Sequence, residues 1–303
     1  MAGLKELRGR LASVKSTQKI TTAMKLVAAS RLRKAQTALE KNRGYSALLH
    51  NTITRILTSY KKEEIEKKVT HILPSLFCNT SSPKTYILIV FSSERGLCGS
   101  YNQNVAKTVI KRIHELKKQK KDVKIVCYGK KAYDILKKNH QEMIVHHEAS
   151  FAGGGIFYEE AADMIKKIVR LTKDGHFDVC EIVYSRFISA INRQLISEQI
   201  YPLNTNIFPF DENIDHVKNA YFDYKPSREK ILESAAKKFL TNHVFEAMLS
   251  AEASEQSARM MAMDNATQNA QDMISDLTLE YNTLRQSAIT TELNEIISGA
   301  EAI

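Results

Sequence analysis

Proline is absent from both ends of this 303-residue chain: none occurs in residues 1–73 or after Pro226. The stretch that follows Pro226 also holds a single glycine, Gly299. Proline and glycine are the residues that most often interrupt a helix, so nothing stops a helix there until its last few residues. The C-terminal stretch therefore predicts one helix of about 70 residues, on the order of 100 Å long at ~1.5 Å per residue. A helix of that length needs a partner.

Long apolar runs and clustered cysteines are missing as well. No segment of 18 or more apolar residues occurs, and the first ten residues, MAGLKELRGR, lack the apolar core of a secretory signal. Four widely spaced cysteines, at positions 78, 98, 127 and 180, form no CxxC pair and no Cys/His group with metal-ligand spacing. We therefore expect a soluble protein with reduced cytosolic thiols, without a metal site or a cofactor.

Each end of the chain carries a heptad seam of apolar, small or polar residues. The N-terminal seam consists of Leu4, Leu7, Leu11, Val14, Gln18, Thr21, Lys25, Ala28, Leu32, Ala35 and Leu39. The C-terminal seam consists of Met263, Thr267, Ala270, Ile274, Leu277, Tyr281, Leu284 and Ala288. Residues 1–43 hold 11 Lys/Arg against 2 Asp/Glu, or +9, while residues 230–303 hold 5 against 11, or −6. Narrow seams and opposite charge predict an antiparallel coiled coil of residues 1–60 with residues 227–303.

Residues 61–226 alternate between strand and helix patterns. The run Tyr86 to Phe91 is continuously apolar, which is typical of a strand buried on both faces. Further strands are predicted at 123–128, 142–146, 178–187 and 194–201, with helices at 102–120, 130–139 and 156–172. The expected fold is thus a mixed α+β and α/β class: a long antiparallel coiled coil of the two terminal helices with a central Rossmann-like α/β domain.

Two glycine-rich loops and one histidine pair are the candidates for chemistry. The loop from Arg95 to Gly99 follows a buried strand, where backbone amides can cradle a phosphate, but it matches neither GxGxxG nor GxxxxGK[ST]. A tight strand-to-helix turn is the favoured interpretation of this loop, and a turn is also expected at 153–155. His146 and His147 are adjacent on a predicted strand and so point to opposite faces. No catalytic set emerges.

The net charge of +10 raises the question of nucleic-acid binding. The basic residues of the first helix lie all around it without a set of aromatic residues for base stacking, and an acidic partner helix exists in the same chain. Lys-rich runs such as 61–68 and 117–121 are typical of solvated helix faces. Both observations disfavour nucleic acid as the partner.

The far end of the C-terminal helix is expected to lack a partner within the chain. A first helix from Leu4 to Tyr60 is roughly 85 Å long, shorter than the second, so the second projects past Met1. The projecting end still carries Ile289, Leu293, Ile296 and Ile297. Apolar residues on an unpaired helix end predict a hydrophobic sleeve supplied by other chains.

Three motifs carry a family resemblance. The first runs from Lys15 through Thr21 (KSTQKIT) and on to Gln36, the second is the loop at 94–99 with Asn102, and the third is the ending ITTELNEIISGA at 289–300. With these motifs the chain resembles the gamma subunits of F-type ATP synthases, over essentially its whole length.

This resemblance implies a rotor shaft. The coiled coil would stand inside a ring of three alpha and three beta subunits, while the α/β domain and the foot of the coil would sit on the membrane c-subunit ring with the epsilon subunit. Rotation would couple proton flow to ATP synthesis, with the chemistry in the beta subunits and none in this chain. By the same resemblance the residues that touch the surrounding ring are Met24, Lys25, Arg259, Arg285, Gln286, Thr290 and Glu292, and the residues that form the bearing are Ile289, Leu293, Ile296 and Ile297.

The resemblance begins at about Ala2, which leaves no room for a cleaved transit peptide. We therefore expect a peripheral protein on the cytoplasmic face of a bacterial inner membrane. Two other functions remain open at this point: a coiled-coil scaffold without a partner ring, and a nucleic-acid-binding module that uses the basic first helix.

Overall fold

The structure, a computed structural model, describes residues 2–58, 75–77, 82–149, 155–173, 175–208 and 225–301. These residues belong to two compact units, one of Met1–Ser30, Leu97–Gly99 and Ser257–Ile303 and one of Arg31–Gly96 and Ser100–Gln256. Two long helices, α1 (Ala2–Thr58) and α6 (Arg228–Glu301), contribute to both units. Over the described ranges, no helix is both long enough and apolar enough to cross a membrane.

Both predicted long helices are present. The N-terminal helix was expected to reach Tyr60; α1 ends at Thr58, and the two residues that follow lie outside the described ranges. The C-terminal helix, α6, is 74 residues long, in agreement with a stretch that has no proline and only Gly299 near its end. The domain limits 1–60, 61–226 and 227–303 stay a prediction.

The second unit is built on a five-stranded sheet in the order β3-β2-β1-β4-β5. Its strands are β1 (Thr85–Phe91), β2 (Asp122–Tyr128), β3 (Ile144–Glu148), β4 (Val179–Phe187) and β5 (Arg193–Tyr201). The first four run parallel, and β5 pairs antiparallel with β4. The connecting helices are α3 (Tyr101–Lys118), α4 (Lys130–His140) and α5 (Tyr158–Lys173), with short 3₁₀ turns at Ser75–Phe77, Gln141–Met143 and Thr205–Ile207. The expected Rossmann-like arrangement is confirmed.

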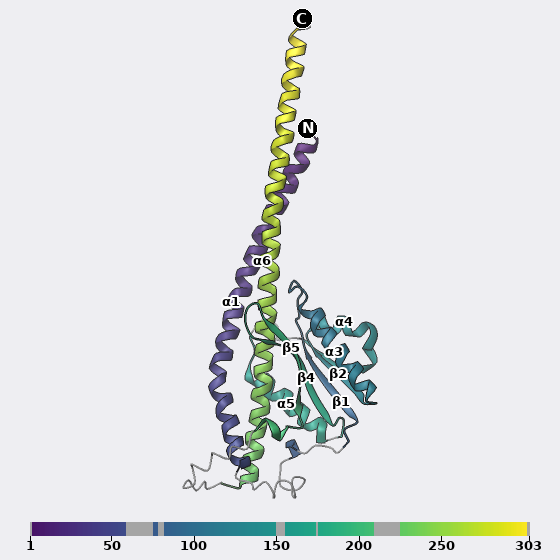
Figure 1. Cartoon of the computed structure of the whole chain (residues 1–303), viewed down its shortest axis with the longest axis vertical. Helices are drawn as coiled ribbons and strands as arrows, with labels where there is room; N and C mark the ends of the chain where they lie inside the picture. The colour runs from purple at the N-terminus through teal and green to yellow at the C-terminus, as the bar shows by residue number, and fades with distance from the viewer. Residues whose placement is uncertain are drawn as a thin grey trace. The chain divides into compact units, whose positions relative to one another are not determined.

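Helices cover both faces of this sheet. The helices α3 and α4 lie together on one face (Figure 1), and α3 buries Val105, Val109 and Ile113 at helical spacing. The other face forms one apolar core with the end of α1, with α5 and with the first turns of α6. Ile53, Leu57 and Leu232 are fully buried in that core, so within this unit the long helices are part of the domain's own interior.

One predicted strand was displaced. It was expected at 142–146, but Gln141–Met143 forms a 3₁₀ turn that continues α4, and the strand begins at Ile144. The strand lies at the edge of the sheet and four of its five residues are exposed, so burial left no periodic signal in its sequence. Cys78, the 61–68 run and the first two glycines of 153–155 lie outside the described residues.

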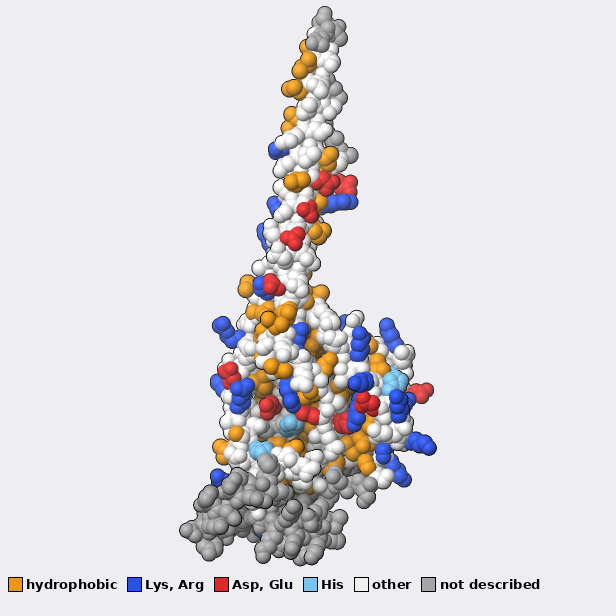
Figure 2. Space-filling view, viewed as in Figure 1, with side chains coloured by type: hydrophobic (Ala, Val, Ile, Leu, Met, Phe, Trp, Pro, Cys, Tyr) orange, Lys and Arg blue, Asp and Glu red, His pale blue; other side chains and the backbone are white. Residues whose placement is uncertain are grey.

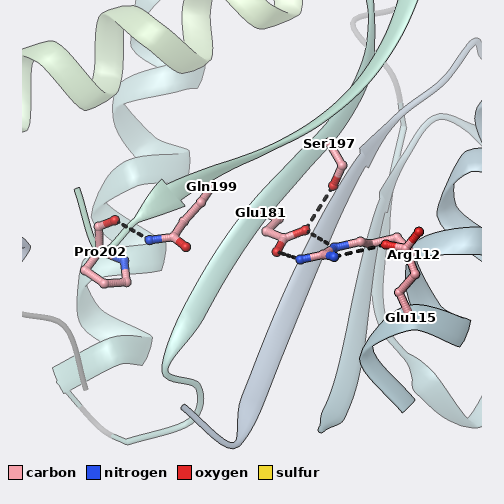
Figure 3. Close-up of polar contacts among 6 residues, drawn as sticks. All are labelled: Arg112, Glu115, Glu181, Ser197, Gln199 and Pro202. Atoms are coloured by element: carbon pink, nitrogen blue, oxygen red, sulfur yellow. Dashed lines mark hydrogen bonds and ion pairs between the residues drawn. The ribbon is translucent and has the colours of Figure 1, made fainter. Parts of the chain in front are cut away.

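An ion pair with a buried carboxylate holds α3 to the sheet (Figure 3). Arg112 donates from Nε and Nη2 to the two carboxylate oxygens of Glu181 on β4, at 2.8 and 2.5 Å. The Ser197 hydroxyl of β5 donates to the same carboxylate at 2.9 Å, and Glu115 accepts a third bond from the guanidinium at 3.1 Å. The hydrogen bond to Glu181 holds the pKa of Arg112 above its ordinary value. The Glu181 side chain is only 5% exposed and the Arg112 side chain is 28% exposed, so the carboxylate is desolvated while the guanidinium keeps some contact with solvent.

Polar contacts also fasten α6 to the sheet within the second unit. Ser250 accepts from the backbone N–H of Phe187 at 2.7 Å, and Ser254 donates to the carbonyl of Ser185 at 2.8 Å. His243 on α6 contacts the carboxylate of Glu198 on β5 at 3.1 Å. Burial raises the pKa of Glu198, but the hydrogen bond and charge of His243, the hydrogen bond from Tyr184 and the charge of Arg186 together outweigh burial, so the pKa lies below its ordinary value.

Candidate functional site

In the first unit, α1 and α6 run antiparallel, and each residue forward along α1 corresponds to one residue back along α6. Arg8 on α1 donates to the hydroxyl of Tyr281 on α6 at 2.9 Å, and Lys25 contacts Asp264 at 2.6 Å. Seventeen residues forward along α1, from 8 to 25, thus correspond to seventeen residues back along α6, from 281 to 264. Gln18 bonds Gln271 at 2.5 Å on the same line. The predicted antiparallel coil is confirmed.

Burial follows the predicted seams until the end of α6. Every N-terminal seam residue from Leu4 to Leu39 is buried or half-buried. On α6 the seam is buried at Met263, Ala270 and Ile274, half-buried at Tyr281 and exposed at Leu284. The threonine hydroxyls at 21 and 267 bond each other at 2.8 Å inside the seam. The buried seam is therefore narrow and partly polar, and its residues become less buried toward the C-terminus of the chain.

The last turns of α6 have no α1 residue beside them in the described chain. Continuing the register to Ala2 reaches about residue 287 of α6, and Figure 1 shows the C-terminal end of α6 running beyond the N-terminal end of α1. The predicted bearing residues all lie past that point, and their side chains are between 48% and 71% exposed: Ile289, Leu293, Ile296 and Ile297. Within the described chain these four apolar residues are thus uncovered, as the unequal lengths of the two helices predicted.

The exposed end of α6, residues 285–298, has two unlike sides. At ~100° per residue, the four apolar residues and the polar residues Arg285, Gln286, Thr290 and Glu292 fall within about 160° of the helix circumference. The opposite side carries the short polar residues Ser287, Thr291, Asn294 and Ser298 together with Ala288 and Glu295, and no large apolar residue. In Figure 2 the hydrophobic side chains gather along one edge of this narrow end. A partner that surrounds the helix would meet chemically different surfaces on its different sides.

The remaining predicted contact residues form a second group on the coil, farther from the C-terminal end of α6. Met24, Lys25 and Arg259 are half-buried, and Lys25 is bonded to Asp264 across the coil. Arg285 lies 21 residues beyond Asp264 along α6, which corresponds to ~30 Å. The structure therefore places the seven predicted contact residues in two groups, and it does not bring these groups together.

Sequence reasoning did not single out three exposed apolar residues of α1 close in sequence to Met24 and Lys25. Ile20, Leu26 and Val27 on α1 are 57%, 65% and 55% exposed, although they are large and apolar. The available signal was their position off the heptad seam, because an apolar residue that does not face the partner helix must face outward. Asp264 was also missed as the intramolecular partner of Lys25.

The glycine loop before α3 has the geometry of a tight turn. Asn102 accepts from the backbone N–H of Ser93 at 3.1 Å, and the Ser93 hydroxyl donates to the carbonyl of Arg95 at 2.7 Å. Gly99 has φ +58 and Leu97 has φ 63, so the chain reverses through the left-handed region where glycine is favoured. These internal bonds support the turn rather than the phosphate cradle. Among the described residues, no group of three or more His, Cys, Asp or Glu side chains is placed to hold a metal.

Comparison with known proteins gives a consistent family. The family model described as ATP synthase matches residues 3–303. The ATP synthase gamma chain of Pelagibacter ubique is 40% identical over 303 residues, covering 100% of both chains. That of Rhodospirillum rubrum is 41% identical over 307 residues, again with 100% of both chains covered.

Two solved structures share the fold. The central stalk and c-ring structure of Tetrahymena thermophila mitochondrial ATP synthase contains a chain with TM-score 0.60 and 23% identity, covering 82% of this chain and 99% of that chain. A Euglena gracilis mitochondrial ATP synthase chain has TM-score 0.54 and 19% identity, covering 90% and 95%. At such identities the likeness supports the fold alone.

Proposed function

The chain belongs to the ATP synthase gamma-chain family and is the central rotor shaft of an F-type ATP synthase, and we propose how its surfaces perform that role. Its partners are the ring of three alpha and three beta subunits, the epsilon subunit and the membrane ring of c subunits. It couples proton flow through the membrane to ATP synthesis in the alpha/beta ring by rotation. The chain is thus part of a membrane-bound complex.

The observation that carries the mechanism is the two-sided end of α6. As the shaft turns, each catalytic subunit of the ring meets first the side with Arg285 and the apolar residues and later the opposite side, which has no large apolar residue. A ligand shifts a conformational equilibrium only by its difference in affinity for the two states. A shaft with unlike sides supplies such a difference at each angle, so the three catalytic sites are held in different conformations.

The contact residues act in two ways in this proposal. Arginine and short polar side chains such as Gln286 and Thr290 form hydrogen bonds of modest net energy that break as the shaft turns. The apolar set of Ile289, Leu293, Ile296 and Ile297 rests in a hydrophobic bearing that keeps the end centred. Met24, Lys25 and Arg259 make a second set of transient contacts about 30 Å lower along the coil.

Assembly tests this function directly. Affinity purification of the full chain from its source cells is expected to yield alpha, beta and this chain in a fixed 3:3:1 ratio with ATPase activity. Self-association without other subunits would instead indicate a coiled-coil scaffold, and salt-sensitive nucleic-acid binding would indicate the third alternative.

We further propose that the chain catalyses no step itself. The Ser93–Asn102 bonds that close the glycine loop as a turn support this proposal. Calorimetry of the purified chain with ATP and magnesium is expected to show no micromolar binding, and the chain alone is expected to hydrolyse no ATP. Micromolar binding that is lost on replacement of Gly96 or Gly99 would contradict the proposal.

The location is proposed to be the cytoplasmic face of a bacterial inner membrane, with the chain attached peripherally through the complex. The bacterial relatives, which are about 40% identical over the full length, support this location. Fractionation of the source cells should recover the chain with the inner membrane. A treatment that releases the chain from the membrane should release the alpha and beta subunits together with it.

A further inference from the structure

A cavity of about 600 Å³ lies between α5 and α6 in the second unit. Its floor is apolar and consists of Ala162, Ile165 and Val169 from one face of α5, with the ring of Tyr158 at one end. Ile165 is 4% exposed and belongs to the core, so the floor is continuous with the domain's interior. The volume falls within the range of ~300–1,000 Å³ that is usual for small-molecule sites.

The rim of this cavity carries one sign of charge. Four cations line it, Lys166 and Arg170 from α5 and Lys237 and Lys238 from α6, while none of its described lining residues is a carboxylate. Lys166 and Lys237 pair with Asp163 and Glu233 on their own helices, both at exposed positions. Such pairs are weak and exchange readily with another anion. Neither Arg170 nor Lys238 is paired with a carboxylate among the residues that the structure describes.

The hydroxyl groups of the cavity are already engaged. Burial, with a smaller contribution from Tyr45, raises the pKa of Tyr158 to about 12, so the phenol stays neutral at physiological pH. Thr241 donates to the backbone carbonyl of Lys237 at 2.9 Å. The four cations must therefore bind the polar group of a ligand, and the apolar floor must accommodate the rest of the ligand.

The size favours a small ligand over a macromolecule. A stable protein–protein interface takes about 20–30 residues a side, whereas this cavity is formed by one face of α5 and about one turn of α6. We propose that the cavity between α5 and α6 binds a single-chain anionic amphiphile: an acyl chain on the apolar floor, and a carboxylate or phosphate head held by Arg170 and Lys238. A planar guanidinium and an ammonium suit both kinds of head.

Calorimetric titration of the full chain with sodium dodecanoate, kept below its critical micelle concentration, tests the proposal. One-to-one binding is expected. A parallel titration with dodecyl phosphate distinguishes a phosphate head from a carboxylate head. Whichever of the two amphiphiles binds more tightly identifies the preferred head group. Acetate, which lacks the chain, and dodecyltrimethylammonium, which reverses the head charge, are expected not to bind.

Three variants locate the site. The double replacement R170Q/K238Q is expected to weaken dodecanoate binding by about tenfold or more, since it removes two charge-assisted contacts. Ala162→Phe fills the floor and is expected to abolish binding. Lys167→Gln is the matched control: it removes one charge from the same helix, but Lys167 faces Glu148 and does not line the cavity, so binding should be unchanged.

The absence of wild-type binding would overturn the proposal. Equal binding of the cationic amphiphile, or equal loss of binding in the Lys167→Gln control, would overturn it as well. Because Ala162→Phe acts at the edge of the core, circular dichroism should verify its folding. The surface double variant tests the same site if Ala162→Phe does not fold.

Discussion

Replacing Arg285 and Gln286 with alanine is expected to leave assembly of the ATP synthase intact while its ATPase rate falls by about tenfold or more. Both side chains are exposed and lie beyond the last buried seam residue of α6, Ile274, so their loss does not disturb the buried part of the coil. A hydrogen bond to a charged group contributes about 1.5–3 kcal/mol, and ~1.4 kcal/mol in a barrier is a factor of ten in rate. The yield of 3:3:1 complex and its ATPase rate are the measurements.

The apolar residues of the same helix end provide the matched comparison. Converting Ile289, Leu293, Ile296 and Ile297 to alanine removes apolar area worth on the order of several kcal/mol of burial in the bearing. Assembly should therefore weaken by mass action, while the complexes that still form keep their coupling. Normal assembly with a wild-type rate in the Arg285 and Gln286 variant would show that these residues do not act as angle-dependent contacts.

Replacing Arg112 with methionine is expected to destabilise the α/β domain by about 3 kcal/mol, because it leaves the carboxylate of Glu181 buried without its partner. For a domain of this size that corresponds to a fall in melting temperature of roughly 6–12 °C. Thermal unfolding followed by circular dichroism gives the measurement.

Two variants separate this effect from a general loss of charge. Glu115→Gln removes the more exposed partner of the same guanidinium and should change stability by only about 0.5 kcal/mol. The double replacement R112M/E181L removes both charges and should recover most of the lost stability, since apolar residues often replace a buried pair without loss. A double variant as unstable as Arg112→Met would contradict the unpaired-charge explanation.

The coil and most of the sheet followed from the sequence because their signals are local. A stretch free of helix breakers fixes α6, and heptad spacing fixes the seam residues that the structure buries, from Leu7 to Ile274. Continuous apolar runs such as Tyr86 to Phe91 mark strands that are covered on both faces. The edge strand β3 was displaced by two residues because exposure removes that signal.

The candidate site was less accessible to sequence reasoning. The exposed end of α6 could be anticipated from the unequal helix lengths, but the roles of Arg285 and Gln286 came only from resemblance. The contact of Lys25 with Asp264 depends on the register between two segments 239 residues apart, which the heptads of either helix alone do not determine. The Arg112–Glu181 pair likewise depends on how α3 crosses β4, and no local pattern encodes it.

The most direct test of the rotor function is to watch the chain turn. In complex fixed to a surface through the alpha/beta ring, a bead attached to cysteine introduced by Lys107→Cys, an exposed position on α3, reports the angle of the α/β domain. With ATP, the bead should rotate in one direction and pause at three angles, because the ring repeats its subunits three times. A bead that stays still while the same complexes hydrolyse ATP at the full rate would contradict the rotor function.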